Sequence, residues 1–408
     1  MSEKQKKIFK TIVIVLVIIL IAEIIYFGFR YYKIRKESTY YTVVNSLILT
    51  DDGYTGVGLS DYRYSDFNEY DKGYQKATLF VNKDEEIIKE VTVDLGYNSF
   101  FNDIVKTSDG YIAVGAIEMT KEQVEEKTNE GLIVKYDKNF KEVWRKNVNE
   151  LGKTELFKVK LDKDENIIIA GTSVYGSGYM GNHITGGGML FKYDSDGKEL
   201  FRVNNGGPYQ GRFNDVIVES DGYVVVGLGK ANSGIIIKYD TKGKKVWSSS
   251  YGYTDEKGIL AVDKLGNNYV TATTKVVSKE DLSNYQAALV IFDKNGKKVD
   301  DTKYSDNKVN GFADVKVIDD MIFVCGYTGK KTNSELKSDA IVVKYDKDLY
   351  EEEYSKIKGE NNDIYSSIYQ KDDSIYLLGY SNSKLEDFDK LNGYDYFPIL
   401  KKYDSDLK

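Results

Sequence analysis

The sequence predicts an all-β fold: a β-propeller of about seven four-stranded antiparallel blades, preceded by a single N-terminal transmembrane helix. Three observations support this prediction: a strand motif that recurs seven times, short turns rich in Asp, Asn and Gly, and one long apolar run near the N-terminus. A four-stranded unit cannot bury two apolar faces alone, so repeated units indicate sheets that stack on their neighbours.

Each repeat is marked by a β-rich run that ends in a small residue. These runs end at Gly58, Gly115, Gly171, Gly227, Ala272, Gly326 and Gly379, at intervals of 45 to 57 residues. A second run follows within the unit and ends at an aspartate, as in GIIIKYD at Asp240. Self-similarity at such a period is the signature of a repeat architecture.

The second unit shows the four predicted strands, at Phe101–Thr107, Tyr111–Gly115, Leu132–Tyr136 and Glu142–Val148. The first two strands, and the last two, are separated by short turns with the residues that hairpins require. A β-sandwich does not account for a four-strand unit that recurs seven times.

The pattern F-x-D-V…DGY-x-V-x-G…KYD-x-x-G-K-x-x-W, clearest at Phe213 to Trp247, resembles bacterial β-propeller repeat proteins of the SBBP and PQQ-like kind. The resemblance covers nearly all of 43–408 and implies a fold rather than a function. Quinoprotein dehydrogenases are rich in tryptophan, whereas only Trp144 and Trp247 are present. The turn Asp240–Gly243 also lacks the spacing of a sialidase Asp box. The resemblance therefore implies neither activity, and no cofactor is expected.

Residues 11–29 form an apolar run with one charge, Glu23, flanked by lysines and arginines. At 1.5 Å per residue it spans about 28 Å, close to the hydrocarbon thickness of a bilayer. No small-residue cleavage site follows the run, which favours a retained signal anchor over a cleaved signal peptide. We expect a short cytoplasmic tail at 1–10, the anchor at 11–29, a juxtamembrane segment at 30–42 and an extracytoplasmic propeller at 43–408. The predicted location is thus the cell membrane, in a single pass.

The charge distribution argues against nucleic acid as a partner. Segment 1–36 holds eight of the 57 Lys and Arg residues and two of the 64 acids, which leaves 49 bases and 62 acids in 37–408. A domain this acidic is poorly suited to phosphate backbones. The single cysteine, Cys325, excludes an intramolecular disulfide, and the single histidine, His183, excludes a multi-histidine metal site within the chain. No metal site is predicted.

The segments between the second and third strands are long in most units, whereas the other turns are tight. We call the face that carries these long connections the loop face and the opposite face the turn face. Long connections on a rigid scaffold usually carry recognition. We predict ligand contacts from four tyrosines of the loop face, Tyr62, Tyr64, Tyr175 and Tyr179, because tyrosine stacks on sugars and anchors proteins. The alternative is that they pack against their own connections.

A second candidate site lies where the first strands surround the predicted channel, at its mouth on the loop face. The aligned positions hold Ser46, Asp103, Val159, Asp215, Leu260, Asp314 and Ser367. The carboxylates of Asp103, Asp215 and Asp314 suit a cation or a basic group. In the structural alternative, each carboxylate accepts backbone N–H bonds from the neighbouring blade.

These features favour a non-enzymatic binding or scaffold module for a protein or glycan of the cell envelope, since no catalytic constellation is readable. The alternative is an envelope carbohydrate-active enzyme that uses two channel-mouth carboxylates as acid and base. A purely structural spacer is the third class. The seventh unit supplies three strands, the last at Ile399–Tyr403, so we predict that part of the segment Lys33–Thr42 pairs with that strand and closes the ring.

Overall fold

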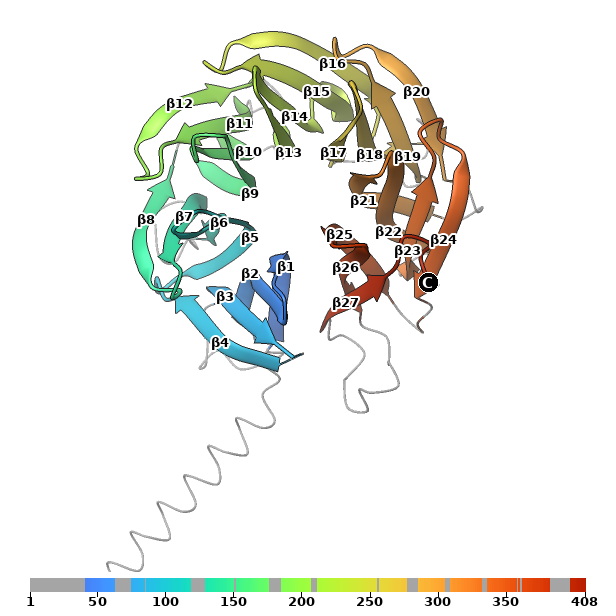
Figure 1. Ribbon diagram of the computed structural model, residues 1–408. Coiled ribbons are helices and arrows are strands. Elements are labelled where there is room, and N and C mark those ends of the chain that lie inside the picture. Colours follow the sequence, from blue (N-terminus) through green and yellow to red (C-terminus); the bar gives the residue numbers. More distant parts are fainter. Residues whose placement is uncertain are drawn as a thin grey trace, which may run out of the picture.

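The computed structural model describes residues 41–62, 75–84, 86–118, 129–149, 152–175, 185–206, 211–254, 257–276, 285–304, 309–331, 336–357, 359, 362–381 and 397–408. These residues form seven antiparallel sheets arranged in a ring (Figure 1). Six sheets have four strands and the seventh has three. The fold is a seven-bladed β-propeller, as the repeats predict, and we number the blades 1 to 7 in chain order.

Every blade follows the chain order of its strands, from the strand nearest the axis to the strand at the rim. Blade 1 consists of β1 (Tyr41–Leu49), β2 (Gly53–Tyr62), β3 (Lys76–Lys83) and β4 (Glu86–Val93), and blade 2 consists of β5 (Asn98–Lys106), β6 (Gly110–Glu118), β7 (Asn129–Asp137) and β8 (Glu142–Val148). Blade 3 consists of β9 (Lys153–Leu161), β10 (Ile167–Tyr175), β11 (Thr185–Tyr193) and β12 (Glu199–Asn204). Blade 4 consists of β13 (Arg212–Glu219), β14 (Gly222–Leu228), β15 (Ser233–Asp240) and β16 (Lys245–Tyr253), with a 3-10 turn, η1 (Lys230–Asn232), between β14 and β15. Blade 5 consists of β17 (Ile259–Leu265), β18 (Asn268–Val276), β19 (Tyr285–Phe292) and β20 (Lys298–Lys303). Blade 6 consists of β21 (Val309–Ile318), β22 (Met321–Lys331), β23 (Leu336–Tyr345) and β24 (Glu351–Ile357). Blade 7 has three strands, β25 (Asp363–Lys371), β26 (Ser374–Ser381) and β27 (Phe397–Tyr403).

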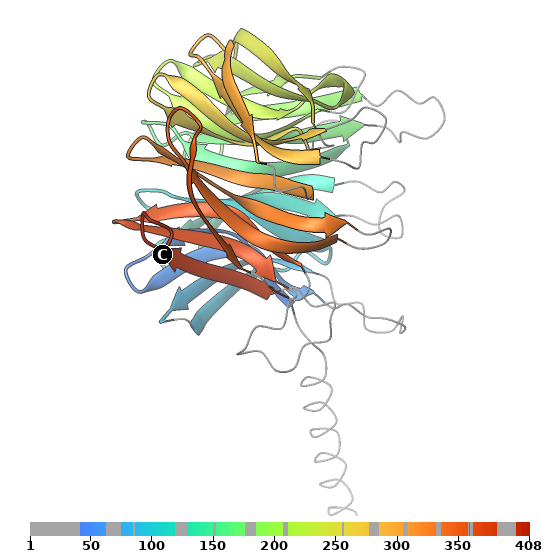
Figure 2. The same cartoon turned by 90° about the vertical axis from the view of Figure 1, so that its right-hand side faces the viewer.

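Burial changes from the middle of each blade to its rim, as the sequence pattern requires. Strand β14 is buried at every position, because blades 3 and 5 cover both of its faces. The rim strand β12 alternates between half-buried and exposed residues, as expected of a strand with one face in water. In the edge-on view (Figure 2), the described hairpin turns and the C-terminus gather on the left, which is the turn face.

The apolar core lies between the blades. The tyrosine of the KYD motif fills this space in four blades, and Tyr136, Tyr193, Tyr239 and Tyr345 are nearly fully buried. Tyr239 packs edge-on against Phe213 of its own blade, with ring centroids 6.3 Å apart. Burying an apolar surface of this size contributes about 1.5–3 kcal/mol. The buried hydroxyls of Tyr136 and Tyr239 have no hydrogen-bond partner among the described residues, which offsets part of that gain.

The aspartate of the KYD motif shapes the tight turn that follows it. In the five blades with KYD, and in blade 5, where the sequence reads IFD, the Oδ1 atom of this aspartate accepts the N–H groups of the residues two and four positions later, at 2.8–3.1 Å. The six aspartates are Asp137, Asp194, Asp240, Asp293, Asp346 and Asp404. Such Asx-type bonds fix a turn without help from the rest of the fold. The motif therefore has a structural role, and the Asp194–Gly197 turn is one instance of it.

The glycine that marks each repeat faces a β-bulge in the first strand. In blade 4 the bulge lies between Phe213 and Asp215, and a Cβ on Gly227 would come within 1.8 Å of the Arg212 carbonyl oxygen. The same approach, at 1.8–2.3 Å, occurs at Gly58, Gly115, Gly171, Gly326 and Gly379. The repeat marker thus records a backbone contact that only glycine permits.

Blade 5 solves the same problem differently and corrects our alignment. The residue that faces its pre-bulge position is Thr273, not Ala272, because Thr273 pairs with Ile259. Gly258 adopts a φ of 78°, and the Thr273 hydroxyl donates to the Gly258 carbonyl at 2.9 Å. The positive φ of Gly258 changes the direction of the backbone before the bulge, so that the Thr273 side chain fits opposite it.

The predicted closing strand receives a partial correction. Tyr41 opens β1 and pairs with Tyr62 of β2, so Tyr41 and Thr42 belong to blade 1 and do not pair with β27. Residues 33–40 lie outside the described residues, as do the predicted tail and anchor at 1–29. None of the helices in the described ranges is long and apolar enough to cross a membrane.

Candidate functional site: the central channel

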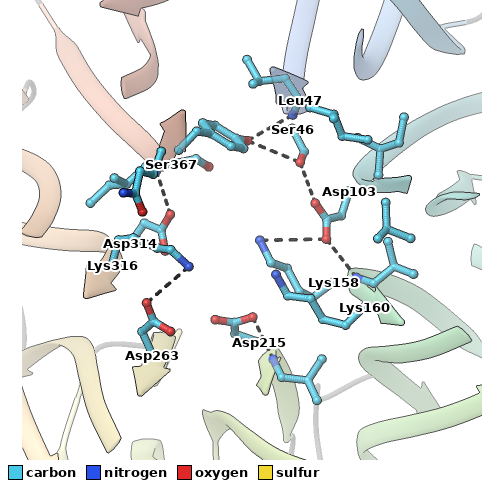
Figure 3. A pocket seen from close by; sticks show the side chains of 18 of the residues that line it. Ser46, Leu47, Asp103, Lys158, Lys160, Asp215, Asp263, Asp314, Lys316 and Ser367 are labelled. Carbon is cyan, nitrogen blue, oxygen red and sulfur yellow. Dashed lines mark hydrogen bonds and ion pairs between the residues drawn. The ribbon is translucent and has the colours of Figure 1, made fainter. Parts of the chain in front are cut away.

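The first strands of the seven blades enclose a cavity of about 740 Å³ on the axis of the ring. A close view (Figure 3) shows charged side chains that point into it from several blades. Because successive side chains of a strand alternate between faces, every second residue of each first strand points toward the axis. The cavity wall therefore consists of layers of inward-facing residues.

Each first strand has a bulge, and the first residue after it differs from our predicted position by one in two blades. The first residue after the bulge is Lys158 in blade 3, where Val159 was predicted, and Ala261 in blade 5, where Leu260 was predicted. The first inward layer therefore consists of Ser46, Asp103, Lys158, Asp215, Ala261, Asp314 and Ser367, and all of these except Ala261 line the cavity. Three carboxylates and one ammonium group share this layer.

A second inward layer follows two residues later in each strand. It consists of Ile48, Val105, Lys160, Ile217, Asp263, Lys316 and Tyr369, all of which line the cavity. Three of these residues are charged, and none of the three was among our predicted site residues. The alternation Lys158-Val-Lys160 within a β-strand was the available signal, because it places two ammonium groups on one face.

The three predicted carboxylates connect neighbouring blades. Asp215 accepts the N–H of Val216 at 2.8 Å and that of Val262, in blade 5, at 3.0 Å. Asp314 accepts the N–H of Val315 at 2.9 Å and that of Ile368, in blade 7, at 2.8 Å.

Asp103 makes the equivalent connection from blade 2. It accepts the Ser46 hydroxyl of blade 1 at 2.6 Å and the Val159 N–H of blade 3 at 2.9 Å. The bond from the Val159 N–H is of the kind that the structural alternative describes, and the bond from the Ser46 hydroxyl adds a side-chain donor. Charge-assisted bonds of this kind are among the stronger hydrogen bonds in proteins.

Asp263 connects blade 5 to blade 6 from the second layer. Its Oδ2 accepts the Val317 N–H at 2.8 Å, and its Oδ1 accepts the Lys264 N–H at 2.9 Å. The Lys316 ammonium lies 3.4 Å from the same carboxylate. Each of the four channel aspartates thus has two hydrogen-bond donors from the protein.

The ammonium groups of the channel are held less closely. Lys158 Nζ lies 3.9 Å from Asp103, beyond hydrogen-bond distance, although the Asp103 carboxylate raises the pKa of Lys158. Lys160 is exposed to the cavity and makes no ion pair or hydrogen bond with any residue that the structure describes. The raised pKa keeps Lys158 cationic at neutral pH.

Asp314 differs electrostatically from an ordinary surface carboxyl. Burial raises its pKa to about 6, and the Asp215 carboxylate adds to this effect. The Lys158 ammonium and the N–H groups of Val315 and Ile368 oppose it. Behind Asp314, burial also raises the pKa of the Cys325 thiol, which keeps Cys325 a neutral core residue.

The cavity extends in a direction that differs from our prediction. Its lining begins at the first inward layer and continues toward the end of each first strand, as in Ser46–Leu49 of β1 and Lys158–Leu161 of β9. The end of the first strand leads into the tight turns. The channel carboxylates therefore line a cavity that extends toward the turn face.

The predicted tyrosines are only partly within the described chain. Tyr62 ends β2 and Tyr175 ends β10, both where the chain enters the loop face. The structure describes the backbone of Tyr62 and Tyr175 but not their side chains. Tyr64, Tyr179 and His183 lie outside the described residues. Within the ranges that are described, no group of three His, Cys, Asp or Glu side chains is arranged to hold a metal ion.

No protein-family model matches the chain, and no curated protein matches it. The solved structure of Sqt1 from Chaetomium thermophilum is similar, with 10% sequence identity, 84% of this chain and 96% of that chain covered, and a TM-score of 0.46. The same protein bound to the N-terminus of ribosomal protein L10 has 10% identity, covers 84% and 94%, and gives a TM-score of 0.48. The β-propeller domain of the Trilobed protease from Pyrococcus furiosus has 10% identity, covers 78% and 84%, and gives a TM-score of 0.41. These likenesses are too distant to carry a function, and the resemblance to SBBP and PQQ-like repeats stays a prediction.

Proposed function

We propose that this chain is a membrane-anchored, extracytoplasmic binding or scaffold module that holds a protein or glycan on its loop face. One observation carries the proposal: the channel carboxylates are occupied as connections between blades. Asp103, Asp215 and Asp314 each join two neighbouring blades through hydrogen bonds. A ring that is stiffened in this way is suited to present the long connections of the loop face, which would recognise the protein or glycan.

The chemistry of those connections supports a protein or glycan ligand. The connections after β2 and β10 contain Tyr64 and Tyr179, and the tyrosines Tyr62 and Tyr175 close the strands that lead into them. Tyrosine offers a large, rigid contact area with one polar tip, which suits both sugar stacking and protein anchoring. The apolar run at 11–29 supports an anchor that would hold this face at the cell envelope.

The experiment is capture of envelope protein and glycan fractions by the full chain in detergent micelles. Replacing Tyr62, Tyr64, Tyr175 and Tyr179 together by serine is expected to abolish capture. Tyr350→Ser is the matched control, because Tyr350 is 71% exposed and lies in the turn between β23 and β24 on the turn face. Capture that survives the fourfold variant but fails with Tyr350→Ser would place the binding face on the opposite side.

One observation favours a carbohydrate-active enzyme as the second candidate. The pKa of Asp314, raised by burial to about 6, is of the kind that a general acid needs. Its two oxygens already accept backbone N–H bonds, which is why this candidate ranks second. Incubating the full chain with cell-wall glycan tests it: release of reducing sugar that Asp314→Asn abolishes would establish the enzyme and displace the binding module.

A further inference from the structure

The central cavity contains ammonium groups whose hydrogen-bond donors are mostly unused, and this feature is independent of the loop face. Its four aspartates each receive two donors from the protein, so every one of their carboxylate oxygens already accepts one hydrogen bond. The ammonium groups of Lys158, Lys160 and Lys316 each have three N–H donors. Apart from the contacts of Lys158 with Asp103 and Lys316 with Asp263, none of the described residues takes up these donors.

The three ammonium groups converge from two sides of the ring. Lys158 and Lys160 lie on β9 of blade 3, and Lys316 lies on β21 of blade 6. Figure 3 shows the two β9 lysines pointing into the cavity and Lys316 pointing toward them from the other side. A ligand between them would contact cationic groups at both of its ends.

We propose that the central cavity binds a small multivalent oxyanion, of the phosphate or carboxylate class, between Lys158 and Lys160 on one side and Lys316 on the other. A volume of about 740 Å³ falls within the range of small-molecule sites. Lysine binds phosphate and carboxylate as a mobile point charge, which suits groups that reach across an open space. The partly enclosed wall strengthens such contacts relative to bulk water.

A divalent cation fits the same cavity less well. It requires six or more oxygen ligands for calcium, or a near-octahedral set for magnesium. The carboxylate oxygens on the wall already accept N–H bonds, and two of these carboxylates, Asp103 and Asp263, have a lysine beside them. A bound cation would have to displace both kinds of contact.

The test is isothermal titration of the full chain in detergent micelles with inorganic phosphate, pyrophosphate and citrate. We expect the trivalent and tetravalent anions to bind more tightly than phosphate, and affinity to fall as salt rises. Lys160→Gln and Lys316→Gln should each weaken binding at least tenfold. Lys242→Gln is the control, because Lys242 lies exposed on a tight turn outside the cavity.

Two results would overturn the inference, provided that circular dichroism shows folded variants. One is the absence of a heat of binding for all three anions at millimolar concentration. The other is binding that neither Lys160→Gln nor Lys316→Gln weakens, since the anions would then bind elsewhere. Calcium binding that Asp215→Asn removes, without anion binding, would assign the cavity to a cation instead. The loop-face tyrosine variant should leave anion binding unchanged, which separates this inference from the proposed function.

Discussion

Replacing Asp215 by alanine removes a carboxylate that connects blade 4 to blade 5. The side chain is only 7% exposed, and it accepts two backbone N–H bonds, from Val216 and Val262. Leaving a buried N–H without its partner costs about 1–3 kcal/mol. Water from the adjacent cavity can satisfy part of this demand, so we expect a loss of about 2–4 kcal/mol in the free energy of unfolding. Asp103→Ala and Asp314→Ala should act in the same direction.

Urea denaturation followed by tryptophan fluorescence and circular dichroism measures this loss. Ser367→Ala is the matched control, because Ser367 occupies the same inward position in blade 7. That change should stay within about 0.5 kcal/mol. An unchanged midpoint for Asp215→Ala, together with loss of divalent-ion binding, would refute the reasoning and make the aspartate layer an ion site.

Three further predictions concern the backbone, a titrating group and the ring closure. Gly227→Ala should destabilise the chain by about 2 kcal/mol or more, because the added Cβ would lie 1.8 Å from the Arg212 carbonyl oxygen. Thr273→Ala should cost only about 1 kcal/mol, because it removes one hydrogen bond to the Gly258 carbonyl. Equal urea midpoints for the two variants would contradict this account of the bulge. The pKa of Asp314 is about 6 when folded and about 3.9 when unfolded, so the folded chain binds more protons in this window and the contribution of Asp314 to stability falls as pH rises from 4 to 6. Asp314→Asn should remove that slope, and parallel pH profiles would disprove the shift. A chain that begins at Lys33 should melt at a higher temperature than one that begins at Tyr41; equal melting temperatures would mean that residues 33–40 do not close the ring.

The sequence predicts the propeller because the residues that recur in each repeat are required by the backbone geometry of the blade. The marker glycines occur where a carbonyl approaches too closely for a side chain, and the KYD aspartates occur where a turn needs a cap. Such local constraints recur in every blade and can be read without a structure.

The site was harder to predict because two blades depart from the common spacing by one residue. In blade 5 the marker position is Thr273 and not Ala272. In blade 3 Gly171 pairs with Leu156, 15 residues earlier, whereas the marker glycine of blade 4 pairs 14 residues earlier, with Phe213. A shift of one residue in a strand exchanges its two faces, so an inward lysine was taken for an inward valine. Asp263 and Lys316 were missed because they lie one layer further along the axis.

The junction between blades 7 and 1 has a mechanical consequence. The polypeptide crosses the other six junctions itself, but blades 7 and 1 come from opposite ends of the described chain. Side chains join them: the Tyr369 hydroxyl accepts the Leu47 N–H at 3.1 Å, the Tyr380 hydroxyl donates to the Val44 carbonyl at 2.6 Å, and Lys371 pairs with Asp51. A pull from the N-terminal side acts directly on this junction, because β1 is the first strand of the described chain and forms one half of it. We therefore expect tension to open the ring at this junction before any other.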